Sequence, residues 1–356
     1  LSRDIAEMFH ETKTLSGRTI YVDPVAGSDS NAGTQDAPLR SLDLALRSDA
    51  SRVILAAGVY DTSTDYVIVT DKVVETLGPV TIRASGADIS QAVWTQQADG
   101  VWSATVAGDI RRVLDNTQLD SDGWPLGLRR YDTVAELAAA DEGWARIGGV
   151  LYVKREDEPT GGDFGVGLEA LFEGRMRSVG ASVLLDGDIE LRGITAEAWF
   201  RDGRRGEVWA TDEVVSVYSP GHAFWAQGGW LVVQGALIRS AWGDGLNADA
   251  FQNEPSLIVD DRVRVEWAGD RRTYFADEVP NRQHSSAHGG ADHISVGGVA
   301  RHDFGQGVAD TSIEDMLSFS WIVDFDVAET TANQIPFQAG VTSLGPNRFM
   351  WVDGVQ

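Results

Sequence analysis

The segment HSSAHGGADH, residues 284–293, holds three of the six histidines of the chain. Imidazole binds metal ions and transfers protons near neutral pH, so this segment is a first candidate for chemistry. Gly289 and Gly290 disfavour a helix, which removes the i,i+4 histidine pair of zinc-binding helices. Three uses stay open: a zinc site, an acid/base or sugar-binding role, and a solvated polar loop. The side chains concerned are His284, His288, Asp292 and His293.

A second group of polar side chains lies on both sides of this segment. Asp244 and Asn247 belong to GDGLN, and Arg301 and Asp303 belong to ARHDFGQG. Glycosidases use two carboxyls about 5–9 Å apart, and a lyase uses a base with a cation or hydrogen-bond donor that stabilises an enolate. The sequence favours Asp244 with Asp303, assisted by Arg301, for either reaction. The alternative is that these residues form only the tight corners between strands.

Tryptophan is abundant, with 12 copies. Trp199, Trp242 and Trp267 end similar segments, which predicts an aromatic stack in the interior or at one corner of the fold. Trp225 and Trp230 flank AQGG and are better candidates for exposed rings, because the apolar faces of pyranose sugars stack on aromatic side chains.

Asp324 and Asp326 fall on the same face of the strand predicted from SFSWIVDFDV. Two carboxylates at this spacing can share a calcium ion, and the alternative is a solubilising surface. Calcium is therefore a candidate cofactor, beside the zinc left open for the histidine segment, and the sequence identifies no cofactor beyond these.

The charge balance restricts the partners of the chain. There are 54 acidic and 29 basic side chains, which give a formal net charge of −25. Such a surface repels nucleic acid and anionic lipid, and no segment reaches the roughly 18 apolar residues of a membrane helix. The absence of cysteine excludes disulfides and thiolate metal sites. We expect an extracellular or virion-associated protein. Because Leu1 is not an initiator Met, we expect that a segment upstream has been removed or left out.

Four segments of the second half resemble one another, and each runs from an apolar residue to a large aromatic one: LRGITAEAW, VQGALIRSAW, VDDRVRVEW and VGGVARHDF. Their spacing fits a unit of about 20 to 25 residues, the period of stacked repeats that share one core. Alternation of apolar and polar residues within the units indicates strands. The sequence therefore predicts an all-β fold, a right-handed parallel β-helix with its apolar faces inside.

Other segments interrupt this rhythm. Residues 1–16 have the apolar spacing of an N-terminal capping helix, and the β-helix is predicted over 17–356. A small inserted β/α unit is expected at about 97–160 and a long loop at about 268–290.

Three segments carry a family resemblance: YVDPVAGSDSNAGTQDAPLRSLDLAL, VILAAGVYDTS and GWARIGGVLYVKREDEP. Through them, and over most of its length, the chain resembles the pectate-lyase-like right-handed parallel β-helix superfamily. This superfamily includes polysaccharide lyases, glycoside hydrolases and tailspike-like phage proteins, so the resemblance implies the architecture more specifically than the activity. The polygalacturonase motifs NTD, DD and GHG are matched here only by DGLN at 244–247, DD at 260–261 and AHGG at 287–290.

These observations predict a protein that recognises a polysaccharide or cell-surface glycan, in the manner of a tailspike, and a homotrimer on a virion is the assembly that accompanies this prediction. The first alternative is a lyase or hydrolase that acts on an acidic polysaccharide. The second is a purely structural virion component.

Overall fold

The computed structural model describes residues 4–266, apart from 63, 85–88, 90–91, 121, 160–166, 250, 253 and 255. It also describes the backbone of four later strands, at 285–288, 292–296, 299–301 and 351–352.

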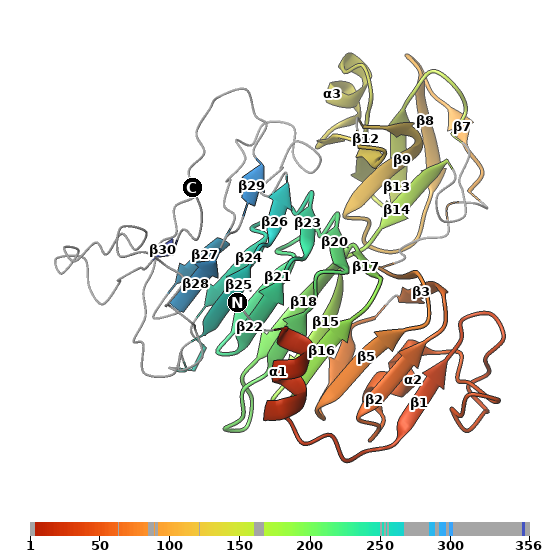
Figure 1. Ribbon diagram of the computed structural model, residues 1–356. Helices are drawn as coiled ribbons and strands as arrows, with labels where there is room; N and C mark the ends of the chain where they lie inside the picture. Colours follow the sequence, from red (N-terminus) through yellow and green to blue (C-terminus); the bar gives the residue numbers. More distant parts are fainter. Residues whose placement is uncertain are drawn as a thin grey trace.

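Most of the described chain forms coils that contribute strands to three parallel sheets (Figure 1). The nine-stranded sheet contains β1 (Thr19–Val22), β2 (Arg52–Leu55), β5 (Lys72–Thr76), β16 (Ser182–Asp186), β19 (Glu207–Ala210), β22 (Trp230–Gln234), β25 (Leu257–Asp261), β28 (Asp292–Val296) and β30 (Trp351–Val352). The seven-stranded sheet contains β3 (Gly58–Thr62), β6 (Val80–Ala84), β17 (Ile189–Arg192), β20 (Val214–Val217), β23 (Leu237–Arg239), β26 (Arg264–Glu266) and β29 (Val299–Arg301). The six-stranded sheet contains β4 (Tyr66–Ile68), β15 (Gly174–Val179), β18 (Ile194–Trp199), β21 (Phe224–Gln227), β24 (Leu246–Asp249) and β27 (Ser285–His288).

The coils stack in register because equivalent apolar residues share the interior. Ser182 pairs with Glu207 and Glu207 with Trp230, so one coil takes about 25 residues. One position further along, a column of buried aliphatic side chains runs through the core: Val183, Val208, Leu231 and Ile258. Since side chains alternate between the two faces of a strand, each such column leaves a neighbouring column on the outside. The predicted all-β fold with parallel strands is confirmed.

The predicted aromatic stack is wrong for the two tryptophans that the structure describes. Trp199 ends β18 in the six-stranded sheet, whereas Trp242 follows β23 in the seven-stranded sheet. The segments that they end lie at different corners of the coil, so the two rings do not form a column. Trp199 instead lies beside Phe251, with 5.8 Å between the ring centroids. Trp267 lies outside the described residues.

The two helices near the N-terminus have different positions. Helix α1 (Ile5–Thr12) buries Ile5 and Phe9 against the outer face of the nine-stranded sheet, where Phe9 lies 5.6 Å from the ring of Trp209. Helix α2 (Leu42–Arg47) contributes apolar side chains to the interior of the first coils, namely Leu42, Ala45 and Leu46. The N-terminal helix therefore covers a sheet face, and α2 takes the position expected of a capping helix.

A segment between β6 and β15 forms two further sheets with a core of its own. The elements are β7 (Thr95–Gln96), β8 (Val101–Thr105), β9 (Arg112–Leu119), β10 (Pro125–Gly127), β11 (Arg130–Tyr131), α3 (Val134–Ala139), β12 (Gly143–Ile147), β13 (Val150–Lys154) and β14 (Leu168–Leu171). We call this segment the insertion; it lies to one side of the coils (Figure 1).

Ion pairs hold the insertion against the seven-stranded sheet. The Arg239 guanidinium is almost fully buried and lies 3.0 Å from a carboxylate oxygen of Asp122 and 2.5 Å from one of Asp120. Arg192 Nη1 likewise donates to Glu169 over 2.7 Å. These contacts join the insertion to strands β17 and β23 of the coils.

Buried Lys72 predicts a pH dependence of stability. Its ammonium donates to the carbonyls of Ser48, at 2.7 Å, and of Ala50, and burial lowers the pKa of Lys72 to about 8. The folded state therefore loses this proton at a lower pH than the unfolded state, so the contribution to stability rises between pH 8 and 10.5. We expect the unfolding free energy to rise by about 1–2 kcal/mol over this window relative to Lys72→Met, measured by urea denaturation. Parallel curves for the two proteins would contradict the assignment.

Candidate functional site

The outer face of the six-stranded sheet carries a row of polar and aromatic side chains. The register pairs Arg177 with Glu197, Glu197 with Trp225 and Trp225 with Asn247. Neighbouring strands lie about 4.8 Å apart, so these four side chains follow one another across the sheet. The columns on either side of this row are apolar and buried, for example Ala196, Phe224 and Leu246. The row is therefore the part of the outer face of this sheet where we look for a functional site.

At one end of the row, hydrogen bonds fix the half-buried indole of Trp225. Its Nε1 donates to Asp249 Oδ2 over 2.7 Å, and Asn247 Nδ2 donates to the same oxygen over 2.9 Å. The ring of His222 lies 5.3 Å from the Trp225 ring, at an angle of 57°. We call His222, Trp225, Asp244, Asn247 and Asp249 the Trp225 cluster.

His222 and Asp244 form an imidazole–carboxylate pair within this cluster. The backbone N–H of Asp244 donates to His222 Nδ1 over 3.0 Å, and Asp244 Oδ2 lies 3.4 Å from the same nitrogen. Accepting that bond places the proton of the neutral ring on Nε2. In this form the ring has no free lone pair and leaves Nε2–H as a hydrogen-bond donor. Only with a second proton on Nδ1, which would break this bond and face Asp244 Oδ2, could the ring act as a general acid.

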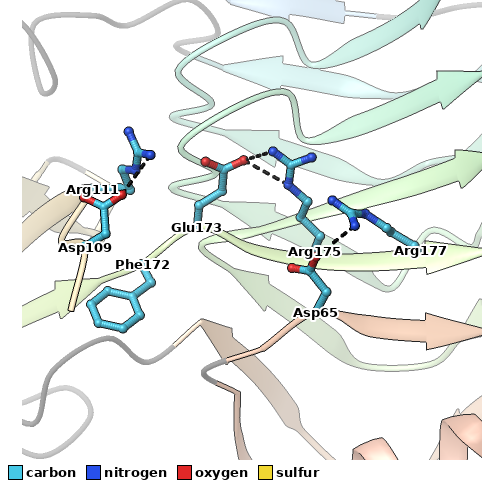
Figure 2. A pocket seen from close by; sticks show the side chains of 7 residues that line it. All are labelled: Asp65, Asp109, Arg111, Phe172, Glu173, Arg175 and Arg177. Atoms are coloured by element: carbon cyan, nitrogen blue, oxygen red, sulfur yellow. Dashed lines mark hydrogen bonds and ion pairs between the residues drawn. The ribbon is translucent and has the colours of Figure 1, made fainter.

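The middle of the row is a network of ion pairs around Glu197, whose side chain is fully buried. Glu197 accepts from Arg175 Nη1 at 3.0 Å and from Arg177 Nε at 2.6 Å. Burial raises the pKa of Glu197, and the two guanidinium groups oppose this shift. Each arginine also contacts a second carboxylate: Arg175 contacts Glu173 at 3.0 Å and Arg177 contacts Asp65 at 2.9 Å (Figure 2).

A pocket of about 380 Å³ opens at the other end of the row, beside Arg177. The loop between β8 and β9 and the segment between β14 and β15 meet strand β15 here (Figure 2). The lining residues are Asp65, Asp109, Arg111, Phe172, Glu173, Arg175 and Arg177. The insertion therefore supplies one wall and the six-stranded sheet the other.

The structure brings together three of the residues proposed from the sequence. Asp244, Asn247 and Trp225 all belong to the Trp225 cluster. Trp230 does not, because it begins β22 in the nine-stranded sheet, where the Arg205 guanidinium lies 5.2 Å from its ring.

The structure describes only the backbone of four other candidates. His288 pairs with Asp249, so strand β27 continues the six-stranded sheet beside the Trp225 cluster. Asp292 and His293 belong to β28 in the nine-stranded sheet, and Arg301 ends β29 in the seven-stranded sheet. The roles of these four residues stay predictions.

In the backbone pairing of β28, His293 lies opposite Ile258 and Ile294 lies opposite Val259. His284, Asp303, Asp324 and Asp326 lie outside the described residues, so the proposed Asp244–Asp303 pair and the proposed calcium site stay predictions as well.

Sequence reasoning missed several members of the site. His222 lies three residues before Trp225, Asp249 lies two residues after Asn247 in β24, and Arg175, Arg177 and Glu197 fall within strands. The available signal was charge at alternate positions of a strand, in RMRSV and in TAEAW, where the positions between are apolar or small.

Within the part of the chain that the structure describes, no group of three or more His, Asp or Glu side chains could hold a metal ion. The described helices are all too short or too polar to cross a bilayer.

Comparison with known proteins gives structural neighbours only. No family model matches the chain, and no curated protein matches it. A complex of XylC with xylose aligns at 11% identity and a TM-score of 0.43, over 80% of this chain and 68% of that one. The GH136 lacto-N-biosidase from Eubacterium ramulus aligns at 12% and 0.32, over 83% and 59% of the two chains. A further structure, titled glycoside hydrolase, aligns at 9% and 0.28, over 79% and 96%. At these values the matches assign the chain to no family.

Proposed function

We propose that this protein binds a polysaccharide along the outer face of its six-stranded sheet. The observation that carries the proposal is the Trp225 cluster, in which a partly exposed indole is fixed by Asp249 and surrounded by amide, imidazole and carboxylate groups. Sugars offer apolar C–H faces together with hydroxyls that donate and accept hydrogen bonds. A rigid aromatic side chain with a few oriented polar groups suits both.

The finer architecture belongs to the same proposal. We infer that the coils form a right-handed parallel β-helix, because nearly all crossover connections between parallel strands have this hand. In such a solenoid the side wall is long and continuous, which suits an extended chain of sugars. Association with a virion or cell surface, an extracellular location and a trimeric state remain predictions that accompany this function.

A second candidate function is cleavage of the bound glycan by a lyase or hydrolase mechanism. The observation that favours it is the His222–Asp244 pair, because the imidazolium form of His222, next to the Asp244 carboxylate, could donate a proton from Nε2 to a sugar that lies on Trp225. Asp244 lies in this pair, although its expected partner Asp303 is not described.

Incubation with a panel of neutral and acidic polysaccharides tests both candidates. We expect retention of the protein on at least one immobilised polysaccharide in a pull-down. Cleavage would add new reducing ends, and a lyase would also add the ultraviolet absorbance of unsaturated sugar ends. Absence of both retention and products across the panel would contradict the proposed function.

A further inference from the structure

The pocket beside the Trp225 cluster has a distinctive charge arrangement. Each of its three guanidinium groups contacts a carboxylate: Arg111 with Asp109 at 2.8 Å, Arg175 with Glu173 and Arg177 with Asp65. The buried side chain of Glu197 accepts hydrogen bonds from two of these arginines, Arg175 and Arg177. Three positive and four negative groups thus meet at this place, and the local balance is negative.

This balance disfavours an anionic ligand. A ligand carboxylate would have to displace Glu173, Asp65 or Asp109 from its arginine and would then lie among the remaining carboxylates. The net charge of −25 adds long-range repulsion. A uronate or sulfated sugar is therefore a poor fit, although the pocket contains three arginines.

An uncharged sugar fits the same groups well. Guanidinium N–H groups donate and carboxylate oxygens accept, so an arginine–carboxylate pair can satisfy both functions of a hydroxyl. The ring of Phe172 lines the pocket and gives an apolar surface for a sugar face (Figure 2). The pocket also adjoins Arg177, which lies two strands, or about 10 Å, from Trp225 in the register. A short run of sugar units spans this distance.

We infer that the pocket is a binding subsite for an uncharged sugar unit, and that the arginine–carboxylate pairs select neutral glycans against uronate-containing ones. This inference rests on the proposed function, because the glycan that enters the pocket is the one that lies on Trp225. It replaces the expectation of an acidic polysaccharide with a neutral one.

The test is a charge-changing double variant, Asp65→Asn with Glu173→Gln, probed with neutral, uronate-containing and amino-sugar oligosaccharides of matched length on an array. Both side chains are partly exposed, so the substitutions disturb little packing. Asp61→Asn is the matched control, because Asp61 forms an equivalent 2.6 Å ion pair with Arg83 outside the pocket. We expect the wild-type protein and the control to prefer neutral oligosaccharides by at least about tenfold, and the double variant to lose most of this preference by gaining uronate binding.

The outcomes separate this inference from the proposed function. A wild-type preference for uronates or amino sugars would overturn the inference and leave the glycan-binding function intact. The inference would also be overturned, and the glycan-binding function left intact, if Trp225→Ala abolished binding but the double variant had the same selectivity as the wild-type protein. Absence of binding to every oligosaccharide would overturn both.

Discussion

Replacement of Trp225 by alanine is expected to abolish most glycan binding, with a loss of affinity of at least about thirtyfold. The substitution removes the aromatic surface of the site and also the N–H that donates to Asp249. Central aromatic anchors of binding sites typically contribute about 2 kcal/mol or more. Titration calorimetry with the best polysaccharide-derived oligosaccharide measures the loss.

Two further variants make this result specific. Trp225→Phe keeps a ring but loses the N–H, so we expect an intermediate affinity. Trp230→Ala removes a half-buried tryptophan from the nine-stranded sheet, away from the Trp225 cluster, and we expect it to bind as the wild-type protein does. Equal losses in Trp225→Ala and Trp230→Ala would point to a general effect on folding and not to the site.

Replacement of Trp144 by alanine is expected to destabilise the insertion by about 3 kcal/mol or more and to leave the coils folded. Trp144 is fully buried in the core of the insertion, and its Nε1 donates to the carbonyl of Leu128 over 3.1 Å. Large-to-small substitution at such a position leaves a cavity and an unpaired carbonyl. Because the insertion has its own core, the loss should be confined to it.

Hydrogen exchange resolved by peptide measures this effect. Peptides between β7 and β14 should lose protection, whereas peptides of β16, β19 and β22 should keep it. Trp102→Ala is the comparison, since Trp102 is only partly buried at the edge of the same core and should cost less. Loss of protection in both groups of peptides would show that the insertion and the coils fold as one unit.

The coils were predictable from the sequence because their signal is local and repeated. Apolar residues alternate with polar ones inside each strand, and the unit recurs often enough to define a period. The corner to which a unit belongs was not predictable in the same way. LRGITAEAW and VQGALIRSAW look alike, but the first enters the six-stranded sheet and the second the seven-stranded sheet. Similar turn residues at the corners of a coil produce similar sequences, so the alignment of Trp199 with Trp242 failed.

The candidate site was predictable only where its residues are neighbours in the chain. Asp244 and Asn247 lie in one short segment, and Trp225 stood out by residue type. Asp249 belongs to the same strand as Asn247, whereas His222, Glu197 and the two arginines reach their partners through pairing between coils, which requires the register. A shift by one residue reverses the face of a strand. The register between successive coils therefore decides which polar residues form a site, and this register cannot be read from the sequence.

Hydroxyl-radical footprinting with and without a bound glycan is the measurement that tests most directly where this protein binds its ligand. We expect Trp225, His222 and Phe172 to become protected when the glycan binds, and Trp230 on the neighbouring sheet to keep its reactivity. Protection of Trp230 with unchanged reactivity at Trp225 and His222 would contradict it, and would move the binding surface away from the six-stranded sheet.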